Sequence, residues 1–181
     1  ADYRQNIRAR EVFHFDATAP RSSVTLPPAA TTRPETWYNT PITATFTATD
    51  TLSGVDHIEY AIDAGPWQKG QQAVIDRDGK HILFYRAVDK AGNVEMANRV
   101  TVRLDTTPPI LRHAVVSPQG WTTKNVYTVT WQAPLDDSGI AGIWYKVGSA
   151  PLSATDGTFF AGDSPTHFSV PREGRFDLYL W

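Results

Sequence analysis

The chain has 181 residues, of which 41% are hydrophobic and 20% charged, and its formal net charge is −2 at pH 7. This balance is typical of a folded protein and excludes a disordered chain or a broad electrostatic attraction to nucleic acid or to an anionic membrane. The absence of cysteine excludes disulfides, thiolate catalysis and cysteine zinc sites, and no apolar run approaches the roughly 20 residues that cross a bilayer.

The predicted elements, taken in chain order, occur twice. Residues 16–20 (Asp-Ala-Thr-Ala-Pro) recur as residues 105–109 (Asp-Thr-Thr-Pro-Pro), and the same order of features follows each marker. Trp37, for example, matches Trp121. A period of about 90 residues is too long for a solenoid repeat and suits a string of sandwich domains.

Alternation of apolar side chains predicts strands in both copies. In residues 42–48 Ile, Ala, Phe and Ala alternate with threonines, and residues 127–133 repeat that face. The other alternating rows are residues 58–62 with their counterpart 143–147, residues 81–87 with the partial counterpart 176–180, and residues 100–104 in the first copy alone. No stretch has a helical apolar stripe, so the sequence predicts an all-β protein.

Turn residues between these rows complete the prediction. Asp, Gly, Asn and Pro gather at residues 50–54, 63–66, 76–79 and 91–93, where they supply side-chain caps and positive-φ positions. About seven antiparallel strands with two inward faces, in about 90 residues, form a β-sandwich. The prediction is therefore two antiparallel sandwiches joined end to end by a short proline-containing linker.

Several motifs of the first copy follow one another in a specific order and spacing. They are Asp50-Thr-Leu-Ser-Gly-Val55, Asp63-Ala-Gly-Pro-Trp67, Tyr85-Arg-Ala-Val-Asp89, Ala91-Gly-Asn93 and Leu104-Asp-Thr-Thr-Pro-Pro109. In this order they resemble the bacterial immunoglobulin-like, fibronectin III-like repeats of large surface proteins and secreted multidomain hydrolases. The second copy, centred on residues 137–148, resembles a related variant. The resemblance implies tandem Ig-like sandwiches with a structural or adhesive role, and it implies no catalytic residues.

The same comparison of the two copies predicts the domain boundaries. Residues 1–15 are a leading segment that reads as the closing strand of a preceding repeat, because Phe13-His-Phe-Asp16 resembles Val102-Arg-Leu-Asp105. Residues 16–105 form repeat 1, and residues 106–181 form repeat 2, which lacks its last strand. An incomplete sandwich exposes an unpaired edge. One hypothesis is that strand exchange with another copy caps this edge.

No constellation of residues predicts an enzyme. Neither Gly-x-Ser-x-Gly nor His-Glu-x-x-His occurs, and the five histidines are scattered without a shared spacing. His81 stands where related sandwiches often place a corner tyrosine, so we expect it to form a hydrogen bond across the turn.

Metal binding has two interpretations. Asp16, Asp89, Asp105 and the pair Asp136 and Asp137 could gather near the seam between the copies, where a hard cation such as Ca²⁺ binds several carboxylates. Alternatively, each aspartate accepts backbone N–H bonds within a turn. Calcium is the one cofactor that the sequence leaves open.

Exposed aromatic side chains would be the means of binding a ligand. Trp67 follows a turn, and Trp144 faces outward beside two inward residues, so these two are the candidate ligand-binding residues. A single outward tryptophan more often packs on a neighbouring strand or domain than forms a sugar platform. Trp37 and Trp121, at equivalent positions, are expected to pack over a sandwich end.

The sequence thus predicts a non-catalytic spacer or adhesion module of a larger extracellular bacterial protein, secreted or at the cell surface. Its expected partners are neighbouring domains of the same polypeptide, and a glycan or a surface protein stays open. Neither nucleic acid nor membrane insertion of this segment is expected. The alternative function is an accessory carbohydrate- or protein-binding module attached to a secreted hydrolase.

Overall fold

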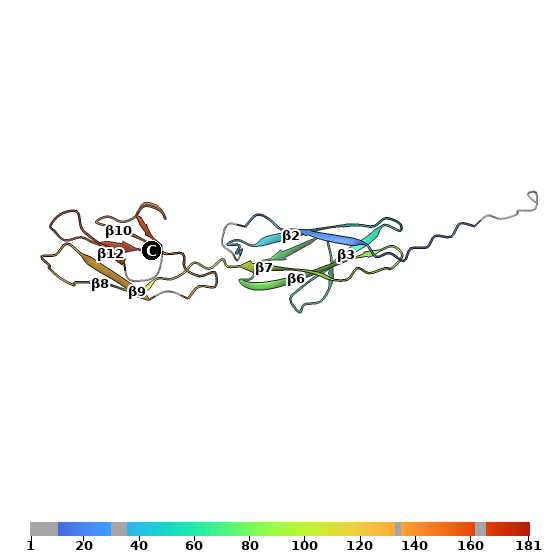
Figure 1. Cartoon of the computed structure of the whole chain (residues 1–181), viewed down its shortest axis with the longest axis horizontal. Coiled ribbons are helices and arrows are strands. Elements are labelled where there is room, and N and C mark those ends of the chain that lie inside the picture. Colours follow the sequence, from blue (N-terminus) through green and yellow to red (C-terminus); the bar gives the residue numbers. More distant parts are fainter. Residues whose placement is uncertain (1–10, 30–35, 133–134, 162–165) are drawn as a thin grey trace, which may run out of the picture. The chain divides into compact units, whose positions relative to one another are not determined.

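The computed structural model describes residues 11–29, 36–132, 135–161 and 166–181, and every regular element in these ranges is a β-strand (Figure 1). The chain divides into two compact units, Ala1–Thr106 (unit 1) and Thr107–Trp181 (unit 2). In the described part of the chain, no helix has the length and apolar character needed to cross a membrane.

Unit 1 is a sandwich of two antiparallel sheets that face each other (Figure 1). One sheet has the order β1-β2-β5 and the other the order β4-β3-β6-β7. The strands are β1 (Arg21–Thr25), β2 (Ile42–Thr49), β3 (Val55–Ile62), β4 (Gln68–Lys69), β5 (Gln72–Ile75), β6 (Gly79–Asp89) and β7 (Asn98–Leu104). This arrangement is that of an immunoglobulin-like fold, which confirms the predicted fold class.

The core of unit 1 lies between the inward faces of these sheets. Ile42, Ala44 and Phe46 of β2 are buried, whereas the threonines between them are exposed, as the alternation predicts. The Phe46 ring stacks on Tyr60 at 5.6 Å and on Tyr85 at 5.4 Å between ring centroids. These aromatic contacts join the two sheets, because Phe46 belongs to one sheet and both tyrosines belong to the other.

The chain joins and leaves unit 1 at opposite ends of the sandwich. β1 begins at Arg21, which pairs with Thr49 at the end of β2. β7 finishes at Leu104, which pairs with Gly79 at the start of β6. We call the end near Thr49 and Asp89 the leading end and the end near Gly79 the trailing end. The two are separated by the length of β6, about 35 Å at the usual rise per residue.

Unit 2 contains two three-stranded antiparallel sheets, with the orders β12-β9-β8 and β11-β10-β13. The strands are β8 (Arg112–Ser117), β9 (Tyr127–Gln132), β10 (Ile143–Val147), β11 (Thr158–Phe160), β12 (Thr166–Phe168) and β13 (Leu178–Leu180). Val129, Trp131 and Ile143 are its buried core residues among those described. β13 is an edge strand, whereas its counterpart β6 lies between β3 and β7.

The pairing registers of the two units are equivalent. Tyr60 lies opposite Tyr85 in unit 1, and Tyr145 lies opposite Leu180 in unit 2. These pairs occupy the positions that the alignment of the two sequence copies equates. The repeated apolar rows therefore form the same pair of strands twice.

Candidate functional site

Three carboxylates meet at the leading end of unit 1. Asp16 precedes β1, Asp50 follows β2, and Asp89 is the last residue of β6. One ligand atom of each lies within 4.8 Å of those of the other two. Asp89 is almost fully buried, at 2% exposure, whereas Asp16 and Asp50 are half-buried. These residues are far apart in the sequence but meet because β2 and β6 both end at the leading end of the sandwich. The chain enters unit 1 at the same end.

Each of these carboxylates accepts hydrogen bonds from backbone N–H groups. Asp50 Oδ1 accepts from Gly54 at 2.7 Å and from Leu52 at 3.1 Å, which forms the turn between β2 and β3. Asp89 Oδ1 accepts from the N–H of Asn93 at 2.8 Å and from that of Ala91 at 2.9 Å. Both turns match the capping interpretation of the sequence.

Asp16 fastens the leading segment to unit 1 rather than capping only its own turn. Its Oδ2 accepts the N–H of Ser53 at 2.9 Å, and its Oδ1 accepts the N–H of Thr18 at 2.9 Å. The side-chain amide of Asn93 donates to the Asp16 carbonyl at 3.1 Å and to Asp89 Oδ2 at 2.8 Å. Asn93 thus links the leading segment to the turn after β6.

These hydrogen bonds keep two of the clustered carboxylates charged. The Thr18 N–H, followed by Ser53, lowers the pKa of Asp16. Burial by itself would raise the pKa of Asp89, but the hydrogen bonds from Asn93 and Ala91 outweigh it, and the pKa is lowered. Carboxylate oxygens are the donors that Ca²⁺ prefers, so Asp16, Asp50 and Asp89 are the described residues that could hold this ion. The turn caps account for the same three side chains.

Of the acidic residues in the seam hypothesis, the structure brings Asp16 and Asp89 together and places Asp105 at the opposite end of unit 1. Asp105 follows Leu104 at the trailing end, so the length of β6 separates it from Asp89. Asp136 caps its own turn in unit 2, where its Oδ1 accepts from the Ser138 hydroxyl at 2.8 Å, and Asp137 is exposed. Asp50 was missing from the prediction. Its membership follows from the β2 and β6 ends meeting in space, which no local pattern shows.

Glu95 forms a second polar centre, which ties β1 to the opposite sheet. The N–H of Ser22 donates to both carboxylate oxygens, at 3.0 and 3.1 Å, and the Ser22 hydroxyl donates to Oε2. The N–H of Ala87 in β6 also donates to Oε2 at 3.0 Å, and the Asn98 amide donates to Oε1 at 2.9 Å. One half-buried side chain therefore connects the first strand of unit 1 with its last two.

The trailing end is held by its own contacts. Tyr38 forms a parallel bridge with Leu104: its N–H donates to the Arg103 carbonyl at 2.9 Å, and its carbonyl accepts from Asp105 at 2.8 Å. The N–H and hydroxyl of Thr106 donate to Asp78 Oδ1, at 2.8 and 2.9 Å. The chain is therefore fixed to the sandwich up to the point where it leaves unit 1.

His81 forms the hydrogen bond across the turn that the sequence predicts. Its Nδ1 lies 2.9 Å from Asp63 Oδ2, and its Nε2 lies 2.8 Å from the Arg77 carbonyl. Burial lowers the pKa of His81, but the bonds to Asp63 and Arg77 outweigh it, so the pKa is raised. The His81 bond, together with the Ile82 N–H, lowers the pKa of Asp63. The imidazole thus serves as a structural link.

The two tryptophans that the sequence offers as ligand-binding residues both contact neighbouring side chains. The Arg86 guanidinium lies 4.3 Å from the centroid of the Trp67 ring, and Glu59 holds that guanidinium at 2.8 Å. Trp67 is 40% exposed, with one face covered by Arg86. Trp144 is half-buried and lies 5.2 Å from the Phe159 ring. Trp67 belongs to unit 1 and Trp144 to unit 2.

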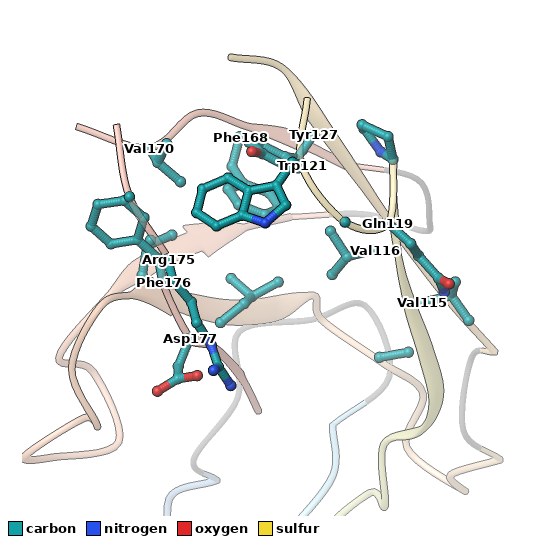
Figure 2. A pocket seen from close by; sticks show the side chains of 16 residues that line it. Val115, Val116, Gln119, Trp121, Tyr127, Phe168, Val170, Arg175, Phe176 and Asp177 are labelled. Carbon is teal, nitrogen blue, oxygen red and sulfur yellow. The ribbon is translucent and has the colours of Figure 1, made fainter. Parts of the chain in front are cut away.

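Trp121 is an exposed aromatic residue of unit 2 that was not among the two candidate ligand-binding residues. It was expected to pack over a sandwich end, but it is 88% exposed, so that expectation is wrong. It lines a pocket of about 730 Å³ in unit 2. Figure 2 shows its ring between Phe176 and Arg175 on one side and Val116 on the other. No local sequence pattern indicates this exposure, because it depends on which segments of unit 2 pack near Trp121.

No protein-family model matches the chain, and no curated protein matches it. Among solved structures, the chain is similar to one described as the D00-D0 domain of intimin, with a TM-score of 0.39 and 11% sequence identity. The superposition covers 88% of this chain and 91% of that one.

Proposed function

We propose that this chain is a non-catalytic spacer within a larger extracellular bacterial protein, secreted or held at the cell surface. The observation that carries the proposal is the path of the chain through unit 1. The chain joins at one end of the sandwich, where Asp16 fastens it, and leaves at the other, where Asp78 fastens Thr106. A module built in this way adds the length of a sandwich to whatever its two ends connect.

The strand directions of unit 1 also suit a module that transmits tension. β1 and β7 both run from the leading end to the trailing end, as their pairing with β2 and β6 requires. Tension applied through the chain would pull β1 and β7 in opposite directions along their own axes. The inter-strand hydrogen bonds lie across these axes, so they share the load and must break together.

Single-molecule pulling tests this proposal, and the absence of native cysteine allows handles at chosen positions. Handles on cysteines at Ala17 and Thr107 load unit 1 along its strands. Handles on cysteines at Lys69 and Arg99, on strands β4 and β7 at opposite edges of one sheet, load it across the strands. We expect a clearly higher unfolding force in the first geometry. Equal forces, or a lower force along the strands, would refute a load-bearing role.

The alternative, an accessory glycan- or protein-binding module, has less support in unit 1. A sugar platform needs an open aromatic face, and Arg86 occupies one face of Trp67. Trp67→Ala should therefore destabilise the Arg86–Glu59 contact. If the chain is retained on a polysaccharide column, this variant should be retained equally well. Loss of polysaccharide binding in this variant would favour the alternative.

A further inference from the structure

Positive side chains gather on the outer face of the four-stranded sheet of unit 1. Side chains alternate between the two faces along a strand, and those of paired residues point to the same face. Leu83 of β6 is fully buried on the inner face, so residues an odd number of positions away from it point outward. On that outer face, Lys80 stands opposite Arg103, and Phe84 stands opposite Arg99.

The charged residues of these pairs form a strip along β6 and β7, which we call the basic strip and define as Lys80, Arg99 and Arg103. Lys80 and Arg99 are exposed, and Arg103 is half-buried. Arg99 and Arg103 are four positions apart on one strand, which is about 13 Å at the usual rise per residue. A single small anion does not span this length, so the strip suits a polymer with repeated negative charges.

The rest of the outer face does little to neutralise the basic strip. Among the paired residues of this sheet, all of which the structure describes, Glu59 is the one carboxylate on that face. It accepts hydrogen bonds from Arg86 at 2.8 and 3.0 Å, about 20 Å along β6 from Lys80. Within the strip, Lys80 lies directly opposite Arg103, and like charges at paired positions destabilise a sheet. An anionic partner offsets that repulsion.

The position of the strip favours a polysaccharide over a peptide. β6 lies between β3 and β7, so its backbone groups already pair inside the sheet. A peptide on this face gains none of the backbone hydrogen bonds by which extended peptides add to a sheet edge, and a flexible acidic peptide also loses conformational entropy on binding. Sugar rings are stiffer, and they bring hydroxyl groups and apolar C–H faces to the exposed Thr101 and the half-buried Ile82 and Phe84.

We propose that the outer face of β6 and β7 binds a polysaccharide that carries carboxylate groups. Arg99 and Arg103 donate paired N–H bonds to successive carboxylates, because the planar guanidinium matches their two oxygens, and Lys80 adds a point charge. The sugar rings between these contacts lie over Ile82 and Thr101, which occupy the paired positions between the charged residues. This binding is ionic and is separate from the spacer role.

Calorimetric titration of the 181-residue chain with polygalacturonate tests the proposal. Dextran is the uncharged sugar polymer for comparison, and poly-L-glutamate carries the same charged group on a peptide backbone. Polygalacturonate should bind at least about tenfold more tightly than either. Its affinity should fall about tenfold or more between about 50 and about 200 mM salt, because roughly three ion pairs release counterions from the polymer.

Charge reversal locates the site. Lys80→Glu/Arg99→Glu should weaken polygalacturonate binding at least about tenfold. The control Arg21→Glu/Lys124→Glu changes the net charge by the same amount at exposed positions on β1 and in unit 2, and it should bind as the wild type does. Trp67→Ala should do the same, since its ring lies outside the strip. Lys80→Gln/Arg99→Gln, which introduces no repulsion, should also weaken binding while melting at the wild-type temperature, so the test holds if the reversed variant fails to fold.

Three results would overturn the proposal. The first is a wild-type chain that binds polygalacturonate no more tightly than dextran. The second is equal affinity for poly-L-glutamate, which would point to an acidic polypeptide instead. The third is an equal loss of binding in the basic-strip variant and in its charge-matched control, which would place the contact elsewhere on the surface.

Discussion

Replacing Glu95 with glutamine is the sharpest perturbation of unit 1 that leaves its shape unchanged. The Glu95 carboxylate accepts hydrogen bonds from Ser22 in β1, Ala87 in β6 and Asn98 in β7. Glutamine is isosteric, but one of its terminal groups is a donor. At least one N–H or O–H that now reaches a carboxylate oxygen would face an NH₂ group instead.

The magnitude follows from the hydrogen bonds that are lost. A hydrogen bond to a charged group contributes about 1.5–3 kcal/mol, and an unsatisfied donor adds a desolvation cost of about 1–3 kcal/mol where it is buried. Because Glu95 is only half-buried, water offsets part of this cost. We expect Glu95→Gln to lower the free energy of unfolding of unit 1 by about 2–3 kcal/mol, and its melting temperature by about 8–24 °C.

Urea denaturation and calorimetry of the full chain measure this change, with Glu173→Gln, an exposed glutamate of unit 2, as the control for the same chemical replacement. The variant Ser22→Ala removes the hydroxyl that donates to Glu95 Oε2. Its effect should therefore be smaller in the Glu95→Gln background than in the wild type. If Glu95→Gln leaves unit 1 as stable as the wild type, or if the two substitutions are additive, the carboxylate does not join the two sheets.

Two further substitutions test one local feature in each unit. His81→Phe should remove a pH dependence: the raised pKa of His81 means that its contribution is complete below its unfolded pKa near 6.5 and is lost as the pH rises through the folded pKa. The pKa of Asp63 is lowered from 3.8, so this carboxylate contributes above that value and loses its contribution as the pH falls through its folded pKa. Between pH 5 and pH 8, therefore, the titration of His81 changes the strength of the pair. The denaturation midpoints at these two pH values should differ in the wild type and converge in His81→Phe. Gly142→Ala should destabilise unit 2 by more than about 3 kcal/mol in urea denaturation, because its φ is 154° and a Cβ there would lie 2.1 Å from the Phe160 carbonyl oxygen. Gly120→Ala, where φ is 79° and no atom lies within 4 Å of the added carbon, should cost only the backbone strain of about 1 kcal/mol, and equal losses in the two variants would contradict this account.

The strands with strict alternation could be predicted from the sequence, and those without it could not. β2 alternates Ile, Ala and Phe with threonine over its whole length, and its burial follows that pattern residue by residue. β1 (Arg-Ser-Ser-Val-Thr) has no such row, and its place depends on pairing with β2 and on Glu95. When pairing with neighbouring residues holds a strand in place, its own amino-acid composition gives little indication that it is a strand.

The candidate sites show the same division. The hydrogen bond of His81 could be predicted because one partner, the Arg77 carbonyl, lies only four residues earlier, across the turn before β6. The carboxylate cluster could be predicted only in part. Asp16 and Asp89 were expected to meet, but the presence of Asp50 and the separation of Asp105 depend on which strand ends share an edge of the sandwich. The surroundings of Trp121 likewise come from segments far apart in the sequence, since Val116 and Phe176 line the same pocket.

The sequence by itself determined the all-β class, the repeated sandwich pattern and the turns, because apolar periodicity and turn chemistry act over a few neighbouring residues. Only the tertiary structure decided which carboxylates meet and which strands Glu95 connects. These features depend on register and on contacts between residues distant in the chain, and such contacts are fixed by the packing of two sheets against each other.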